Sequence, residues 1–337
     1  MFKTTLLIIV ISISFASFAD DFIFGVGIHP LTQNLDNKRV SNILTGYGFS
    51  SFRTDYPWSR VEKIKGIYQT ADYKIDNMID IALAKGIKPM LILDYGNVNY
   101  DLKTAENPRS KPNSEESRLA FAKYSSWVSL HFKDKINLYE IWNEWIQTDG
   151  RKGAGFYSVF NNESADIYAD LVIKSCRAIK INNPDAIVVA GGIDPFDDKS
   201  NKWLAKVISK NVMSCLDGIS IHPYYFPNKK EISSEPVVNI LKYTHEFFVK
   251  ENHGREVNFY ITEIGVPITS VSKYSIEDIE SYFNDFYQNA YNLKFVKGVW
   301  WYDLIDDGKN KNITQDNFGL FYNDGEDKKI MRKSLLK

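Results

Sequence analysis

The segment Tyr139-Glu140-Ile141-Trp142-Asn143-Glu144 has the pattern of a short buried strand that ends in an Asn-Glu pair. Far downstream, Phe259-Tyr260-Ile261-Thr262-Glu263 ends in a second glutamate in the same way. Either glutamate alone would be interpreted as a solvated residue at the end of a strand. Two carboxyl groups at the ends of buried strands, however, match what hydrolysis of a glycosidic bond requires. One carboxylic acid protonates the leaving oxygen, and the other carboxylate attacks or stabilises the anomeric carbon.

Strand-like runs alternate with helical patterns along the rest of the chain. The runs are short and rich in Ile, Val, Leu and aromatic residues, as expected for parallel strands that are buried on both faces. They cover residues 22–26, 50–54, 88–93, 138–142, 186–190, 218–221, 258–261 and 298–302. Helical periodicity is clearest in residues 71–85, 117–132, 164–181 and 275–291. This alternation predicts an α/β fold, a (β/α)8 TIM barrel in a single domain. A doubly wound open sheet is the alternative, which the lack of a glycine-rich phosphate loop disfavours.

Length and composition are consistent with this architecture. The chain has 337 residues, of which 44% are hydrophobic, so it can bury a sizeable core. Aromatic residues make up 14%, an excess that suits sugar binding as well as a bulky core. The net charge is −1 and no basic run with interleaved aromatic residues is present, which argues against a nucleic-acid partner.

The N-terminal residues have the pattern of a signal peptide. Lys3 provides the positive charge, residues 6–13 the apolar run, and Ser17-Phe18-Ala19 the small residues that signal peptidase recognises. We expect residues 1–19 to be removed after Ala19, leaving an exported catalytic domain of residues 20–337 in the periplasm or outside the cell. An uncleaved membrane anchor is the alternative, but the apolar run is shorter than the ~20 residues of a spanning helix, so no stable membrane insertion is expected.

Two cysteines, Cys176 and Cys215, are present. In an exported protein they are candidates for one disulfide bond, and two buried thiols are the alternative. The sequence leaves this choice open.

In a barrel, the C-terminal ends of the strands and the loops after them surround the active site. Arg53 alone would be interpreted as a surface charge and His222 alone as a core histidine. Beside two glutamates, Arg53 is expected to lower the pKa of the attacking carboxylate. Trp300 and Trp301 lie on opposite faces of their strand, and Trp301 is favoured as the site residue because it is nearer the strand end. The candidate substrate-binding residues are His29, Arg53, Tyr95, Asn97, Asn143, His222, Tyr224, Trp301 and Asp303.

Asp303, Asp306 and Asp307 form an acidic group just after the last strand. They resemble metal ligands, but contacts to sugar hydroxyls or solvated turn residues are favoured on an Asp-Asp-Gly loop. No His/Cys group has zinc spacing and no calcium loop is present, so no metal is predicted.

These motifs resemble those of the clan A (β/α)8 glycoside hydrolases. In that clan an Asn-Glu pair after strand four supplies the acid/base and a Glu after strand seven is the nucleophile, which corresponds here to Asn143-Glu144 and Glu263. The clan's strand-two Arg, strand-six His-x-Tyr and strand-eight Trp correspond to Arg53, His222 with Tyr224, and Trp301. Within the clan, the chain most resembles glycoside hydrolase family 39, in particular its bacterial branch encoded with exopolysaccharide genes. Many clan members have a histidine after strand three, where this chain has Tyr95 and Asn97.

The resemblance implies a retaining glycosidase without a cofactor, with Glu263 as nucleophile and Glu144 as acid/base. Endo-cleavage of an exported biofilm or capsule polysaccharide is expected, with an oligosaccharide or polysaccharide as substrate and polysaccharide-export machinery as a candidate partner. A carbohydrate-binding barrel without activity and a clan A transglycosylase are the alternatives. Endo action is suggested by aromatic residues that fall at strand ends, where they would stack on successive sugars: Trp58, Tyr95, Trp145, Tyr224, Tyr225 and Trp301.

Overall fold

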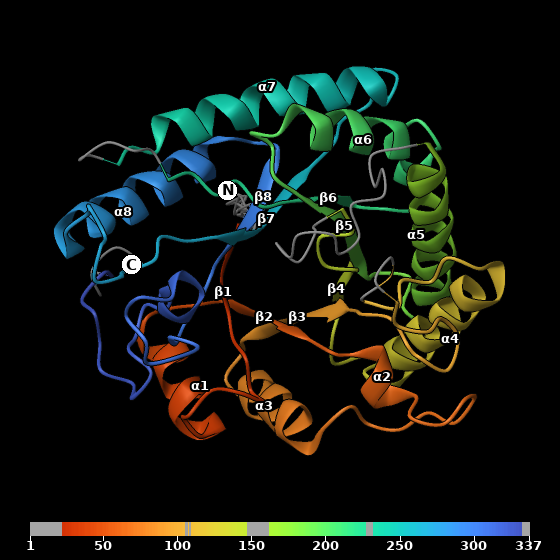
Figure 1. Ribbon diagram of the computed structural model, residues 1–337, viewed down its shortest axis with the longest axis horizontal. Helices are drawn as coiled ribbons and strands as arrows, with labels where there is room; N and C mark the ends of the chain where they lie inside the picture. Colours follow the sequence, from red (N-terminus) through yellow and green to blue (C-terminus); the bar gives the residue numbers. More distant parts are fainter. Residues whose placement is uncertain (1–21, 105–106, 108, 147–161, 227–231, 332–337) are drawn as a thin grey trace, which may run out of the picture.

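The computed structural model describes residues 22–104, 107, 109–146, 162–226 and 232–331. The expected signal peptide lies outside these residues. Eight parallel strands form a closed barrel in the order β1 to β8, and helices form a ring around it (Figure 1). The predicted (β/α)8 barrel is therefore confirmed, and the doubly wound alternative is excluded because the sheet closes between β1 and β8.

The strands agree with the predicted runs to within a few residues at each end. They are β1 (Ile23–Gly27), β2 (Ser51–Asp55), β3 (Lys88–Leu93), β4 (Leu138–Ile141), β5 (Ile187–Ile193), β6 (Gly218–Ile221), β7 (Phe259–Ile264) and β8 (Val296–Trp301). The β7 strand continues one residue beyond Glu263, so this glutamate is the second-last residue of the strand and does not follow it.

The helices of the outer ring follow the strands in sequence. They are α1 (Asn37–Gly46), α2 (Trp58–Val61), α3 (Tyr73–Leu83), α4 (Glu115–His131), α5 (Asn162–Asn182), α6 (Asp198–Ile208), α7 (Glu235–Glu251) and α8 (Ile276–Asn292), with short 3-10 helices at Val212–Ser214 and Thr314–Asn317. Local chemistry fixes their ends. For example, Ser275 accepts a hydrogen bond from the Asp278 amide and the Asp278 side chain accepts one from the Ser275 amide, which forms a capping box at the start of α8.

The inside of the barrel is filled in layers. The lower layer is apolar and consists of Met90, Leu138, Val189, Tyr260 and Trp300. Because side chains alternate along a strand, the residues two positions further on also point inward. On β4 and β7 these are Glu140 and Thr262, both buried, so the apolar filling gives way to a polar layer toward the C-terminal ends of the strands.

Cys176 of α5 and Cys215, just before β6, form a disulfide bond. The choice that the sequence left open is thereby decided in favour of the bond. Among the described helices, none has the length and apolar character of a membrane span.

Candidate active site

The C-terminal ends of the strands surround a cavity of about 430 Å³. This is within the ~300–1,000 Å³ range typical of ligand pockets. Six of the residues predicted from strand ends line it together with Glu144 and Glu263: His29, Arg53, Tyr95, Asn143, His222 and Tyr224. Asp303 lies behind the wall, where it contacts His29. The closed barrel therefore brings residues from β1, β2, β4, β6 and β7 to one place.

Glu144 and Glu263 approach one another in this cavity. One carboxylate oxygen of each, and one ring nitrogen of His222, lie within 4.8 Å of one another. Such proximity suits the ~5–5.5 Å separation of carboxyl groups in retaining glycosidases and is shorter than the ~6.5–9.5 Å of inverting ones.

Glu263 is held by two donors. Arg53 Nη1 donates to its Oε1 at 2.7 Å, and the Tyr224 hydroxyl donates to its Oε2 at 2.9 Å. Burial raises the pKa of the Glu263 carboxyl, but the charges of His222 and Arg53 and the two hydrogen bonds outweigh it, so the pKa is lowered. Glu263 is therefore kept as a carboxylate.

A hydrogen-bond chain joins Glu144 to the barrel interior. His222 Nδ1 lies 3.0 Å from Glu144 Oε1, and His222 Nε2 lies 2.9 Å from Thr262 Oγ1. The Thr262 hydroxyl donates its hydrogen to Glu140 Oε1 at 3.1 Å, and Glu140 Oε2 accepts from Arg53 Nε at 2.6 Å. Since Thr262 donates to Glu140, hydrogen-bond accounting assigns the Nε2 hydrogen to His222, with Thr262 as acceptor.

That assignment places one further proton between His222 and Glu144. If His222 is neutral, Nδ1 is an acceptor and Glu144 must carry the proton; if His222 is charged, Nδ1 donates to a Glu144 carboxylate. Burial lowers the pKa of His222, but the negative charge of Glu263 and the hydrogen bond and charge of Glu144 outweigh burial and raise it. These neighbours therefore favour the protonated form of His222.

The Asn143 amide is fixed by its neighbours. Its Oδ1 accepts from Arg53 Nη2 at 2.8 Å, and its Nδ2 donates to the Tyr95 hydroxyl at 3.2 Å. Tyr95, which stands where many clan A enzymes have a histidine, thus orients the amide beside Glu144.

The backbone around Glu144 is strained. Trp142 has φ of 64° and Glu144 has φ of 48°, in the left-handed region that side chains rarely adopt. Gly192 on β5, with φ of 60°, lies so close that a Cβ atom there would be 2.8 Å from the Glu144 nitrogen. A glycine at this position lets the loop carrying the acid/base candidate pack onto β5.

Two predicted residues do not reach the cavity. Trp301 is fully buried and packs between the barrel and α8, 4.8 Å from Phe283 between ring centroids. The inward positions of β8 are Trp300, inside the barrel, and then Tyr302, which lines the cavity. Asn97 is also buried; its amide donates to the Glu62 carbonyl at 2.8 Å and so supports the loop after β3.

The prediction that the aromatic residues at the strand ends stack on the substrate is also partly wrong. Trp58, Trp145 and Trp301 are buried in the core and cannot stack on a substrate. Tyr95 and Tyr224 line the cavity, joined by three rings that the sequence did not single out: Phe226, Tyr302 and Phe318.

Other residues of the site were missed as well. Glu140 and Thr262 connect Arg53 with His222, and Asp55 and Asp194 line the cavity. Glu140 gave a usable signal, because a charged residue in the middle of the apolar run Leu138-Tyr139-Glu140-Ile141 requires a buried partner.

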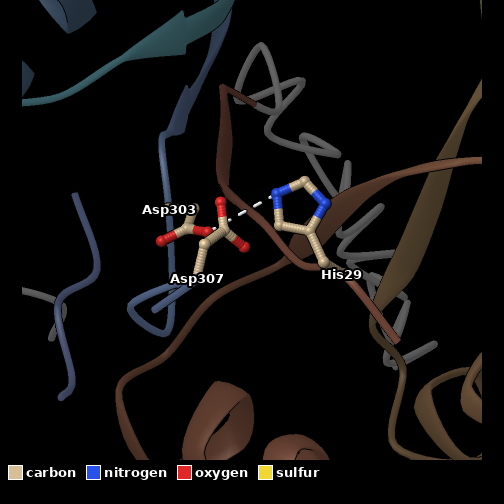
Figure 2. Close-up of side chains that lie close together, drawn as sticks. All are labelled: His29, Asp303 and Asp307. Carbon is tan, nitrogen blue, oxygen red and sulfur yellow. Dashed lines mark ion pairs between the residues drawn. The ribbon is translucent and has the colours of Figure 1, made fainter. Parts of the chain in front are cut away.

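Asp303 lies behind the cavity wall and is buried. Its Oδ2 is 3.5 Å from His29 Nε2, and Asp307 lies beside Asp303 on the same side of the imidazole (Figure 2). Burial raises the pKa of the Asp303 carboxyl, and the charges of Asp307 and Asp306 raise it further.

No protein-family model and no curated protein matches the chain. Solved structures do share its fold. A family 39 glycoside hydrolase from Bacteroides cellulosilyticus WH2 is similar over 92% of this chain, with a TM-score of 0.72 and 24% identity. A monomeric beta-xylosidase from Caulobacter crescentus CB15 is similar over 92% (TM-score 0.67, 18% identity), and xylanase 10B from Thermotoga maritima over 94% (TM-score 0.65, 15% identity).

The matched region is 62% of the Bacteroides protein and 66% of the Caulobacter protein, but 94% of the Thermotoga xylanase. These neighbours agree with the resemblance to clan A and family 39 that the strand-end motifs indicated.

Proposed function

We propose that this chain is a retaining glycoside hydrolase, with Glu263 as the nucleophile and Glu144 as the acid/base. The observation that carries the proposal is the pair itself: two carboxyl groups within 4.8 Å in one cavity, with different partners. Glu263 is surrounded by donors that favour its ionised form, whereas Glu144 forms a hydrogen bond with His222, whose pKa is raised. The fold of the solved glycosidases supports this function but does not by itself establish it.

In the first step a Glu263 oxygen forms a bond to the anomeric carbon as the bond to the leaving oxygen breaks. The leaving oxygen takes the proton held between Glu144 and His222. In the second step Glu144 removes a proton from water, the water oxygen bonds to the anomeric carbon, and the bond to Glu263 breaks. Arg53 and Tyr224 donate hydrogen bonds to Glu263 before the reaction. They stabilise its negative charge again when the bond between Glu263 and the anomeric carbon breaks.

Asn143 is positioned to bind the hydroxyl next to the anomeric carbon. Its two amide atoms are already oriented by Arg53 and Tyr95, so little reorganisation is needed when the sugar binds. Contacts of this kind strengthen in the transition state of glycoside hydrolysis.

The role assignment is tested with two variants on an activated aryl glycoside. Glu263→Ala should form no glycosyl-enzyme, and added azide should give a product of inverted anomeric configuration. Glu144→Ala should keep more activity on substrates whose leaving group needs no proton, and azide should give a product of retained configuration. Glu116→Ala, a change at an exposed glutamate of α4, is the matched control. Exchanged phenotypes would reverse the two roles, and an inactive parent protein would favour a binding barrel.

For the substrate we propose endo-cleavage of an exported bacterial polysaccharide. The family 39 resemblance supports this, together with the aromatic rings that line the cavity, since stacking at sites remote from the cleaved bond can raise turnover of long chains. A product-size profile over time tests it. Early oligosaccharides of mixed length are expected, and steady release of monosaccharide would exclude endo action.

Export itself rests on the signal-peptide pattern, and the Cys176–Cys215 bond supports it because disulfides persist in oxidising compartments. N-terminal sequencing of protein secreted by a suitable host should read Asp20 first. Full-length protein retained in the cytoplasm would contradict export.

A further inference from the structure

Three side chains outside the Glu144–Glu263 pair converge at the seam where the barrel closes. His29 follows β1, and Asp303 and Asp307 follow β8; the two strands are paired, with Val26 opposite Trp301. One ligand atom of each of the three side chains lies within 4.8 Å of the others. Figure 2 shows the imidazole of His29 and both carboxylates directed toward one another. The sequence singled out these aspartates but did not bring His29 to them.

Two of the converging groups each have one polar atom without a hydrogen bond. Asp303 is 1% exposed, and in the part of the chain that the structure describes its Oδ1 has no hydrogen-bond partner. The same holds for His29 Nε2, although it lies 3.5 Å from Asp303 Oδ2. A buried carboxyl group without a partner is costly to ionise, so a positively charged ligand would stabilise its carboxylate form here.

Two lysines near this group form ion pairs with Asp306 instead. Lys328 Nζ donates to Asp306 Oδ1 at 2.5 Å, and Lys311 Nζ donates to Asp306 Oδ2 at 3.1 Å. Asp306, between the two aspartates in sequence, thus has its own cations and is not part of the group. Asp307 accepts a hydrogen bond from the Tyr302 hydroxyl at 3.3 Å, but among the described residues neither carboxylate beside His29 forms an ion pair with a lysine.

We propose that His29, Asp303 and Asp307 bind a divalent cation of the Mn²⁺ or Zn²⁺ type. One imidazole nitrogen and two carboxylate oxygens are a donor set that suits these ions. Such ions bind their ligand atoms at about 2.0–2.2 Å, so the three atoms, now within 4.8 Å of one another, must move closer together around a common ion. The Asp307 side chain is exposed and can turn to do so.

The site is distinct from the other group of this kind, Glu144, His222 and Glu263. There Arg53 already supplies a positive charge, and Tyr224 and Thr262 complete the hydrogen bonds. At the proposed cation site His29 lines the cavity, so open coordination positions of the ion would face a bound molecule.

The test is calorimetric titration of EDTA-treated, dialysed protein with MnCl₂ and, separately, with ZnCl₂, without substrate. We expect one ion per chain for at least one of the two metals. His29→Gln and Asp307→Asn should each weaken that binding at least tenfold. Asp316→Asn, which removes a charge from the same segment without removing a ligand, and Glu144→Gln should bind like the parent protein.

Three results would overturn the proposal: no binding of either metal, binding that His29→Gln and Asp307→Asn leave unchanged, or binding lost only in Glu144→Gln. The folded state of each variant is checked by its thermal transition. Because binding is measured without substrate, this outcome is separate from that of the glycosidase proposal.

Discussion

His222 Nδ1 lies 3.0 Å from Glu144 Oε1, and its other ring nitrogen is already committed to Thr262. Nδ1 is therefore the ring nitrogen that can exchange a proton with the candidate acid. The hydrogen bond and the charge of Glu144 contribute to the raised pKa of His222.

The pH dependence of kcat/KM follows from this pairing. The pKa of His222 is raised, so its proton is retained above the ordinary pKa of histidine and is lost as the pH rises through the raised value. The pKa of Glu263 is lowered, so the nucleophile stays ionised well into the acidic range. We expect a basic limb above the ordinary pKa of histidine and an acidic limb below that of glutamate, both measured in the free enzyme as kcat/KM against pH.

His222→Gln should move the basic limb and reduce kcat/KM by about 10²-fold, the lower range for loss of general acid–base assistance. His245→Gln, at a histidine of α7 paired with the exposed Glu256, should leave the profile unchanged. An unaltered basic limb in His222→Gln would show that the proton is not shared.

Glu140 is predicted to be a positioning residue for Arg53. It is fully buried and accepts from Arg53 Nε at 2.6 Å, while Nη1 of the same guanidinium holds Glu263. Glu140→Gln leaves a buried positive charge with one carboxylate fewer, which should cost about 3 kcal/mol of unfolding free energy, near the lower end for broken buried pairs. Urea unfolding measures this cost.

The variant should also lower kcat more than it changes KM, because Arg53 positions the nucleophile and does not itself need to bind the substrate. Glu116→Gln removes an exposed ion pair with Lys65 and should change stability by less than about 1 kcal/mol. Equal effects of the two changes would argue against a role for Glu140 beyond its charge.

The architecture was predictable because parallel strands buried on both faces leave a strong apolar signal, and their alternation with helices has few solutions. It was harder to predict which side chains at the strand ends point into the barrel. On β8 a shift of one residue exchanges the inner and outer faces. The sequence favours Trp301, which is nearer the strand end, but this residue is buried and Tyr302 lines the cavity. Glu140 lay within the most informative segment, yet its role depends on Arg53, which only the closed barrel brings within reach.

The convergence of His29 with Asp303 and Asp307 was hidden for a related reason. These residues are near opposite ends of the chain, and only the pairing of β1 with β8 makes them neighbours. The sequence alone does not give the register between β1 and β8, so it could not identify His29 as a neighbour of the aspartates.

Gly192 should be required for activity beyond its effect on stability. A Cβ atom at this position would lie 2.8 Å from the Glu144 nitrogen, so Gly192→Ala must displace the loop that carries the acid/base candidate. We expect kcat/KM to fall by about 10²-fold, the scale of a displacement of ~1 Å at a reacting group. Steady-state kinetics on an activated aryl glycoside measure the loss.

Gly254→Ala is the matched control. Gly254 has φ of 78°, and a Cβ atom there would meet nothing within 4 Å. Both variants carry the backbone strain of about 1–2 kcal/mol that a side chain brings to the left-handed region. Only Gly192→Ala should lose activity at a temperature where both are folded; similar activities would show that the contact with Glu144 is not critical.

The Cys176–Cys215 bond joins α5 to the segment before β6, across 39 residues of sequence. A loop of this length predicts a contribution of about 4 kcal/mol, mainly by restricting the unfolded chain. Replacing both cysteines by alanine should therefore lower the thermal transition markedly while leaving kcat/KM nearly unchanged, because neither residue lines the cavity. A reductant should lower the transition of the parent protein and leave that of the double variant where it is. If the parent is insensitive to reductant under unfolding conditions, the bond does not form in the purified protein, and the support that it gives to export is withdrawn.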